Sequence, residues 1–283
     1  MNKQPILEGE AKEIIQKLGY NYLEFAGKGA FKETFKISDS SDGIFAFKLV
    51  NSKKFDPLRT NREIEALKKC DTSLICKLFD FGKSQVTNGD WFFYSIEEYL
   101  DGGTLSKKIN GKTLNAKIVK QYCIDLTKAL SHLDKNKLVH RDIKPDNIMF
   151  RSHEDIPVLV DLGIVRDLSS TSLTLSWIPR GPGTPYFSSP EQLNNNKNLI
   201  DWRSDQFSLG LVLGKCLFGK HPFEDENMNP SQTVERMAQR GSCSDSFVFY
   251  VEKIGFNFLL KMMAPWPVQR YFRPEILIDE LKA

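Results

Sequence analysis

One short run of polar residues constrains this chain of 283 residues more than any other feature. His140-Arg141-Asp142-Ile143-Lys144-Pro145-Asp146-Asn147 follows a helical stripe and precedes a short apolar segment, and Asp161-Leu162-Gly163 ends the next apolar segment. A single polar residue of these types usually does no more than contact water, but eight in this order with this continuation seldom arise that way. The run therefore predicts a loop that brings carboxylates, an ammonium and an amide to one reacting centre.

Strand-like alternation dominates residues 22–99. In Ile44–Val50 it places Ala46 and Lys48 on one face and Phe47 and Leu49 on the other. Packing alone does not explain a lysine on an otherwise apolar face, so Lys48 is a candidate functional residue. The other elements predicted in this part are a lead-in helix at 8–18, a helix near Pro57–Cys70, and turns at Ser38–Gly43 and Thr87–Asp90.

The pattern becomes helical after Gly102. Short strands are predicted at Asn147–Phe150 and Pro157–Val160, and helices at 118–133, Asp201–Phe218, Gln232–Gln239, Phe247–Met263 and Pro274–Lys282. The segment Asp167–Ser189 is rich in Ser, Thr, Gly and Pro and is too long for an ordinary connection, which is typical of functional loops. With a polar hinge near Glu98–Gly103, this order predicts an α+β fold with a β-rich and an α-rich part.

Composition excludes several classes of protein. The formal net charge is +3 with both signs interspersed, so we expect no nucleic-acid partner. No stretch approaches about 18 apolar residues and the first residues lack an apolar core, so we expect neither a membrane span nor a signal peptide. The five cysteines are odd in number and form no CxxC pair, which indicates a reducing compartment, the cytoplasm.

The polar run and Asp161-Leu162-Gly163 resemble the signature set of eukaryotic-type (Hanks-type) serine/threonine protein kinases, H-R-D-L-x-x-x-N followed by D-F-G. The resemblance covers roughly Tyr20 to Lys282. It implies a bilobal kinase fold, with an N-terminal extension at 1–20, a β-rich N-lobe with one main helix at 21–100, and an α-rich C-lobe at 101–283.

The resemblance also assigns roles within the run. Asp142 would accept the proton of the substrate hydroxyl, and Lys144 would neutralise charge on the γ-phosphate of ATP. Asn147 and Asp161 offer the hard oxygen atoms that suit Mg²⁺ bound with ATP phosphates, with Mn²⁺ as an alternative metal.

A glycine-rich segment precedes the Lys48 strand. Gly27 and Gly29 match the first two glycines of the family pattern G-x-G-x-x-G-x-V, whereas Lys32 replaces the third glycine and Thr34 replaces the valine. Glycines let backbone N–H groups approach phosphates closely. By resemblance, Thr34 and Ala46 would form the roof over adenine, and Lys32 adds a cation near the triphosphate.

Lys48 stands in Phe45-Ala46-Phe47-Lys48, which resembles the family's V-A-I-K. It would therefore bind the α- and β-phosphates and pair with a helix glutamate. We assign that glutamate to Glu63, which matches the R-E-I-x-x-L run of the family, and Glu65 is the alternative.

The hinge region resembles that of the family with one departure. The Glu98 carbonyl and the Leu100 backbone would pair with adenine, and Met149 is assigned to the same cofactor site. Glu97 falls at a position that is usually apolar or small. Because an isolated buried carboxylate is costly, Glu97 must be hydrated or paired, and Lys48 is a candidate partner.

The remaining matches predict structural roles. The segment 183–191 resembles the family's G-T-x-x-Y-x-A-P-E, and Asp205 matches an aspartate that fixes loops. Arg270 would pair with Glu191, and Arg273 is the alternative. His140 is expected to pack and hydrogen-bond rather than transfer protons, and His221 is given no chemistry.

Three functions remain open from the residues alone. The first is an active kinase that phosphorylates Ser or Thr of protein substrates with ATP and also phosphorylates itself. The second is a pseudokinase that binds nucleotide as a scaffold, which the altered Lys32, Thr34 and Glu97 favour. The third is a small-molecule kinase of related fold. The sequence does not indicate the physiological substrate, the activating signal or the oligomeric state.

Overall fold

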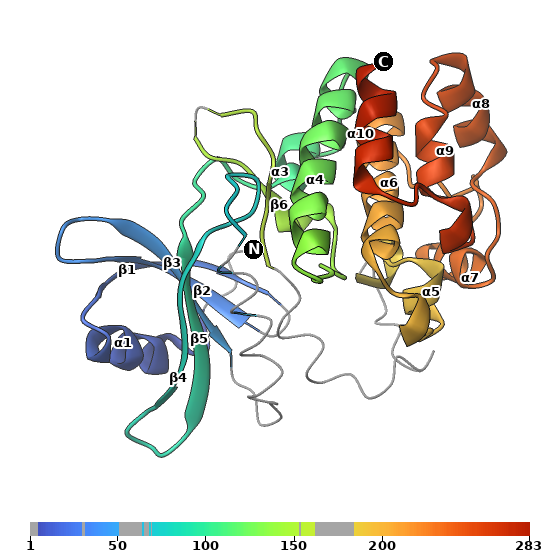
Figure 1. The fold of residues 1–283 in the computed structure, drawn as a ribbon. Helices are drawn as coiled ribbons and strands as arrows, with labels where there is room; N and C mark the ends of the chain where they lie inside the picture. The colour runs from blue at the N-terminus through green and yellow to red at the C-terminus, as the bar shows by residue number, and fades with distance from the viewer. Residues whose placement is uncertain are drawn as a thin grey trace. The chain divides into compact units, whose positions relative to one another are not determined.

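The computed structural model describes residues 5–29, 32–50, 64, 68, 70–152, 154–161 and 184–283. The chain divides into two compact units (Figure 1). The N-terminal unit comprises Met1–Lys68 and Cys76–Asp101, and the C-terminal unit comprises Lys69–Ile75 and Gly102–Ala283.

The N-terminal unit contains an antiparallel sheet of five strands. They are β1 (Asn21–Lys28), β2 (Lys32–Ser38), β3 (Ile44–Val50), β4 (Leu78–Gln85) and β5 (Trp91–Glu98), in the spatial order β1-β2-β3-β5-β4 (Figure 1). The alternation predicted for β3 is confirmed, because Phe47 and Leu49 belong to the apolar core of the unit and are fully buried. Lys48 therefore projects from the opposite face of the sheet.

The predicted lead-in helix is confirmed as α1 (Glu8–Lys17). Its apolar stripe consists of Ala11, Ile14 and Ile15, which are at most 1% exposed and join the core of the sheet. Since full burial of an isoleucine contributes about 1.5–3 kcal/mol, α1 is an integral part of the N-terminal unit.

Two predicted segments lie mostly outside the described residues. Of the helix expected near Pro57–Cys70, Ile64 and Lys68 are described and helical. Of the segment Asp167–Ser189, the residues from 184 onward are described, and Thr184–Phe187 form a short 3-10 helix, η4.

The C-terminal unit is mainly helical, and α4, α6 and α10 pack side by side (Figure 1). Its α-helices are α3 (Leu105–Ile109), α4 (Ala116–Lys135), α5 (Pro190–Leu193), α6 (Trp202–Phe218), α7 (Pro230–Ala238), α8 (Asp245–Lys253), α9 (Phe258–Met262) and α10 (Pro274–Lys282). Its 3-10 helices besides η4 are η1 (Pro145–Asn147), η5 (Lys197–Leu199) and η6 (Pro267–Gln269), and its strands are β6 (Ile148–Met149) and β7 (Val158–Leu159). None of the helices in the described ranges has the length and apolarity that a membrane crossing requires.

Helix ends follow the capping residues in the sequence. The Asn115 side chain accepts the Ile118 amide at the start of α4, and the Asp201 side chain accepts the Arg203 amide at the start of α6. Gly219 ends α6 with a φ of 84°, a left-handed conformation that suits glycine.

One helix prediction is wrong. The apolar pattern predicts a single helical segment over Phe247–Met263, but the structure has two helices, α8 and α9. Gly255 stands between them with a φ of 73°, which stops α8 because a continuous helix needs negative φ values. The predictions for α4, α6, α7 and α10 are confirmed to within a few residues.

Candidate active site

The polar run of the sequence forms a compact hydrogen-bonded cluster in the C-terminal unit. Asp142 Oδ2 accepts from Lys144 Nζ at 2.9 Å and from Asn147 Nδ2 at 2.9 Å. Asn147 Nδ2 also donates to the Asp142 carbonyl at 2.8 Å. The loop between α4 and β6 thus brings together Asp142, Lys144 and Asn147, three of the residues that the sequence singles out.

Asp205, on the first turns of α6, fixes the backbone of this loop. Its carboxylate accepts the amides of His140 at 2.6 Å and Arg141 at 2.7 Å. These bonds hold Arg141 at a φ of 64°, which is an uncommon conformation for a residue other than glycine. Burial raises the pKa of Asp205 to about 7, although the two amides act in the opposite direction. The predicted loop-fixing role of Asp205 is confirmed.

His140 also acts as a structural residue, as predicted. Its Nδ1 accepts the Asp142 amide at 3.3 Å, so its Nε2 carries the hydrogen that is shared with the Val160 carbonyl at 3.0 Å. Burial lowers the pKa of His140, which keeps the ring neutral. The imidazole therefore ties Asp142 to the end of β7 instead of exchanging protons.

The metal ligands expected from the sequence lie on two adjoining segments. The Val160 amide donates to the Asn147 carbonyl at 3.0 Å, which places the backbone that leads into Asp161 beside the loop. The Asn147 side-chain nitrogen donates both of its hydrogen bonds to Asp142, so the side-chain oxygen is the atom that can bind a cation. One amide oxygen and one carboxylate are donors that Mg²⁺ accepts when phosphates and water complete its coordination.

Gln192 also holds the loop, although no family motif in the sequence points to it. Its Nε2 donates to the Arg141 carbonyl at 2.9 Å, while its Oε1 accepts the Ser189 amide at 3.1 Å. Ser189 and Gln192 form a capping box at the start of α5. The S-x-x-Q spacing of such a box is readable from the sequence, so a local signal for this residue exists.

Glu191 and Arg270 form a buried ion pair, as predicted, and Arg273 is not the partner. Arg270 donates to Glu191 through two nitrogens at 2.7 and 3.1 Å, and neither side chain is exposed. Burial alone would raise the pKa of Glu191, but Arg270 and the Ser204 hydroxyl outweigh it and lower the pKa below its ordinary value. The pair anchors α5 to the segment before α10.

His221 repeats the arrangement of His140 at a second place in the C-terminal unit. Its Nδ1 accepts the Phe223 amide at 3.2 Å, and its Nε2 lies 2.8 Å from the Tyr186 carbonyl of η4. Burial lowers the pKa of His221 to about 3. The neutral ring therefore holds the end of the segment 184–187.

This buried histidine predicts a loss of stability in acid. A folded-state pKa below the ordinary 6.5 means that the unfolded chain binds more protons, so the free energy of unfolding falls as pH falls from 6.5 toward 3. His221 alone contributes a loss of about 2 kcal/mol between pH 7 and pH 5. The free energy of unfolding, measured by urea titration across this pH range, should decline less steeply in His221→Gln than in the wild type. The control variant His132→Gln, on α4, should keep the wild-type slope; equal slopes for all three proteins would contradict the assignment.

One face of the N-terminal sheet carries the residues that the sequence assigns to nucleotide binding. Thr34 is the cross-strand partner of Lys48, and Ala46 is the partner of Glu97. Residues that face each other across strands project to the same side of a sheet. Thr34, Ala46, Lys48 and Glu97 therefore share the face opposite the α1 core.

Lys48 and Glu97 form an ion pair on this face, which confirms Lys48 as the predicted partner of the unusual acid. Their side chains are 12% and 15% exposed. Glu97 also accepts from the Ser95 hydroxyl at 2.7 Å, and the Cys76 thiol lies 3.8 Å from it. The negative charge of Glu97 is thus balanced by Lys48 and hydrogen-bonded by Ser95, both in the same sheet. Glu63 and Glu65, the helix glutamates assigned to Lys48, lie outside the described residues.

The two glycines of the β1–β2 hairpin are not required by the described structure around them. A Cβ atom at Gly27 would meet nothing within 4 Å, and one at Gly29 would meet the Lys32 side chain at an ordinary 3.4 Å. Neither has the positive φ that favours glycine. The close approach of Gly27 and Gly29 to phosphates therefore stays a prediction from the sequence.

The hinge assignment rests on backbone groups. The Glu98 amide donates to the Lys77 carbonyl at 2.9 Å, and the Glu98 carbonyl lies 3.6 Å from the Cys76 thiol. Within the described residues, the Leu100 amide and carbonyl make no hydrogen bond, and the role of Leu100 in binding adenine stays a prediction. Met149, the remaining cofactor candidate, lies in β6 of the C-terminal unit and pairs with Val158.

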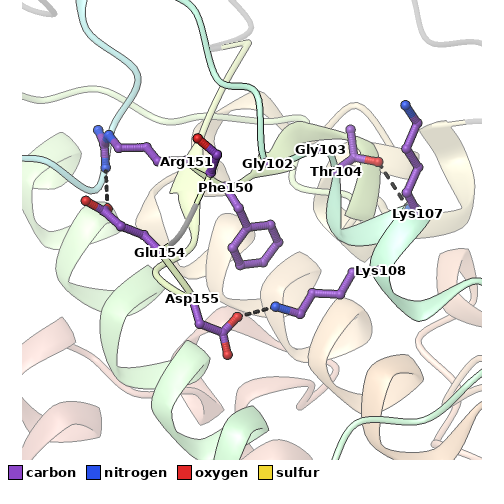
Figure 2. A pocket seen from close by; sticks show the side chains of 10 residues that line it. Gly102, Gly103, Thr104, Lys107, Lys108, Phe150, Arg151, Glu154 and Asp155 are labelled. Carbon is purple, nitrogen blue, oxygen red and sulfur yellow. Dashed lines mark hydrogen bonds and ion pairs between the residues drawn. The ribbon is translucent and has the colours of Figure 1, made fainter.

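Figure 2 shows a hollow in the C-terminal unit. It is lined by Gly102–Thr104, by Lys107 and Lys108 of α3, and by residues 150–152, 154 and 155. Four of its charged residues form two pairs, since Lys108 pairs with Asp155 and Arg151 lies 3.6 Å from Glu154. None of the predicted catalytic or metal-binding residues lines this hollow.

A five-stranded antiparallel sheet with Lys48 on one face, and a helical unit whose loop joins an aspartate, a lysine and an asparagine, define a protein kinase domain. The family model of the protein kinase domain matches residues 20–279. The chain therefore belongs to the protein kinase domain family.

Its relatives come from bacteria and eukaryotes. The chain is 30% identical over 270 residues to the serine/threonine-protein kinase PrkC of Bacillus subtilis, covering 93% of this chain and 40% of PrkC. It is 32% identical over 229 residues to the human serine/threonine-protein kinase Nek5, covering 78% of this chain and 30% of Nek5. The chain thus spans less than half the length of these relatives.

Proposed function

We propose that this chain transfers the γ-phosphate of ATP to Ser or Thr hydroxyls of protein substrates, with Mg²⁺ as the metal. The observation that carries the proposal is the Asp142–Lys144–Asn147 cluster on a loop whose backbone Asp205 fixes. Phosphoryl transfer depends on positioning and charge neutralisation, and this cluster offers both. Lys144 and Thr184-Pro185 resemble the serine/threonine branch of the family, and the matched relatives are named serine/threonine kinases.

In this mechanism the residues of the loop have separate tasks. The Asp142 carboxylate orients the incoming hydroxyl and accepts its proton, and the Lys144 ammonium neutralises charge on the transferred group. The Asn147 oxygen and the Asp161 carboxylate would hold the metal. ATP supplies the phosphoryl group, and Mg²⁺ neutralises the negative charge of its phosphates.

The N-terminal unit contributes the nucleotide contacts. The backbone at Gly27 and Gly29 approaches the phosphates, Lys48 binds the α- and β-phosphates, and Glu63 orients Lys48. The Glu98 carbonyl and the Leu100 backbone bind adenine, and Thr34 and Ala46 contact it. Met149, which lies in the C-terminal unit, is the remaining cofactor candidate. The buried Glu191–Arg270 ion pair, which anchors the segment that follows Thr184, supports a protein as the substrate.

The Lys48–Glu97 ion pair favours a second candidate function, a scaffold that binds nucleotide without turnover. A nucleotide must share the Lys48 ammonium with a carboxylate that already binds it. The two candidates differ in one measurable property, because only the first transfers phosphate.

Self-phosphorylation and a cytoplasmic location complete the proposal. Ser169, Ser170, Thr171, Ser172, Thr174 and Ser176 are the candidate acceptors, and all lie outside the described residues. Arg141, which precedes Asp142, would pair with a phosphate in this segment. The cytoplasm is proposed from the cysteine pattern of the sequence.

Metal-dependent nucleotide binding tests the cofactor assignment. A ligand that binds only the folded state raises the thermal midpoint, so ATP with Mg²⁺ should raise it by several degrees at concentrations about 100-fold above the dissociation constant. Asp161→Ala should lose most of the part that depends on Mg²⁺ while keeping the shift that ATP gives with EDTA. Asp155→Ala, in the hollow, is the control and should keep both parts. An Asp161→Ala protein with the full Mg²⁺-dependent shift would remove Asp161 from the metal site.

A further inference from the structure

Glu33 is a buried acid of the N-terminal unit that the proposed mechanism does not use. It lies in β2 opposite Lys28 of β1, immediately beside the glycine-rich turn. Glu33, Phe35 and Ile37 are buried on one side of β2, while Thr34 alternates to the other side. The carboxylate, 2% exposed, therefore projects toward the α1 side of the sheet and away from the face that carries Lys48.

The partners of Glu33 come from the segment that leads into α1. Its Oε1 and Oε2 accept the Ile6 amide at 2.9 and 3.0 Å, and its Oε2 accepts the Leu7 amide at 2.9 Å. The Lys28 ammonium lies 2.9 Å from Oε1. Burial tends to raise the pKa of Glu33, but Lys28 and the two amides outweigh burial and lower the pKa below its ordinary value. The group is therefore a carboxylate at neutral pH.

These contacts supply a cap that α1 lacks in its own sequence. Leu7 occupies the N-cap position, and no side chain of the helix caps it. Helices begin with amide groups that have no partner within the helix, and an anion near these groups is stabilising. Glu33 provides that anion from β2, so the start of α1 and the glycine-rich hairpin are bound to the same carboxylate.

Helix α1 is itself held firmly at its far end. Glu13 accepts the Thr87 amide and the Thr87 hydroxyl, each at 2.8 Å, and Lys17 donates to the Gln85 carbonyl at 2.8 Å. With Ile14 and Ile15 buried in the core, the helix spans from the β4–β5 turn to the glycine-rich hairpin. The helix is thus fastened to the sheet at its far end and to Glu33 at its start.

We propose that Glu33 is a positioning residue for ATP, which sets the glycine-rich hairpin by fastening it to α1 through the Ile6 and Leu7 amides. Glu33 acts on the nucleotide through the backbone of the hairpin and does not touch it. This inference rests on the proposed kinase function, and it predicts an effect on ATP use that exceeds the effect on the rate of the chemical step.

Steady-state kinetics of the full chain with Mg²⁺, ATP and a generic protein acceptor test the inference. Glu33→Gln should raise KM for ATP about tenfold, while kcat falls less than about threefold and KM for the acceptor is unchanged. Glu24→Gln is the matched control, because Glu24 lies on the same hairpin, is 60% exposed and only pairs with Lys36 at 3.5 Å. It should behave as the wild type.

A second pair of variants leaves the hairpin untouched. Ile6→Pro removes the amide hydrogen that both carboxylate oxygens share, and Ile6→Ala keeps it. The Ile6 side chain is 74% exposed, so neither change removes a side chain from the apolar core. Ile6→Pro should raise KM for ATP in the same direction as Glu33→Gln, and Ile6→Ala should not. Hydrogen exchange at the amides of residues 27–34 should be faster in both affected variants.

The outcomes separate this inference from the proposed function. If the wild type transfers no phosphate, the kinase proposal fails, whereas hydrogen exchange still reports whether Glu33 restrains the hairpin. If the wild type is active and both Glu33→Gln and Ile6→Pro keep its KM for ATP, the positioning role is refuted. A lower thermal midpoint without a change in KM would likewise reduce Glu33 to a structural residue.

Discussion

Replacing Asp142 by Asn should abolish phosphoryl transfer while leaving the fold intact. The amide cannot accept the proton of the substrate hydroxyl, and general-base catalysis contributes about 100- to 10,000-fold to a rate. The side chain is 11% exposed and accepts from Lys144 and Asn147, so an amide of the same shape still fills its place. Turnover of radiolabelled ATP onto a protein acceptor should fall at least about 100-fold, with the thermal midpoint within a few degrees of the wild type.

The matched control for this experiment is Asp279→Asn, the same chemical change at an exposed position of α10. It should keep wild-type turnover, since nothing in the proposed mechanism involves α10. An Asp142→Asn protein that retains near wild-type turnover would refute the assignment of the base. Absence of turnover in the wild type itself would favour the scaffold candidate.

Breaking the buried Glu191–Arg270 pair should have the largest effect on stability. Arg270→Met leaves the Glu191 carboxylate without its counter-charge in a place where neither side chain is exposed. Removing one partner of a buried ion pair costs about 3–5 kcal/mol, because the remaining charge is buried without compensation. The free energy of unfolding from urea titration should fall by about that amount.

Two further variants make this result specific. Arg273→Met changes the exposed neighbouring arginine and should alter stability by no more than about 0.5 kcal/mol. The double variant Glu191→Leu with Arg270→Met removes both charges and should be more stable than Arg270→Met alone. If the single and double variants are equally destabilised, lost packing rather than the uncompensated charge explains the cost.

Local patterns make much of the fold predictable. The strand alternation in Ile44–Val50 has a period of two, so the sequence alone places Lys48 on the face opposite Phe47. The order of Asp142, Lys144 and Asn147 predicts their proximity because the residues are so close in sequence. Asp205 can be identified as a loop-fixing residue only through the family resemblance, since it lies far along the chain.

Other features depend on contacts that cannot be predicted from the sequence. Arg270 and Arg273 both stand near α10, and only the geometry of the turn decides which one reaches Glu191. Apolar spacing continues through Gly255, so periodicity alone does not reveal the break between α8 and α9. Glu33 binds backbone amides 26 and 27 residues away. Every residue except proline has such an amide, so the residue types do not reveal these partners.

The packing of α1 also bears on where this domain can be cut. The family match begins at residue 20, after the helix has ended. A fragment trimmed to that boundary would lose Ala11, Ile14 and Ile15, and it would leave Phe35 and Phe47 of the sheet uncovered. Newly bared aromatic surface of this kind promotes aggregation. The smallest stable fragment of this protein therefore begins before residue 20, at Ile6 and Leu7, whose amides bind Glu33.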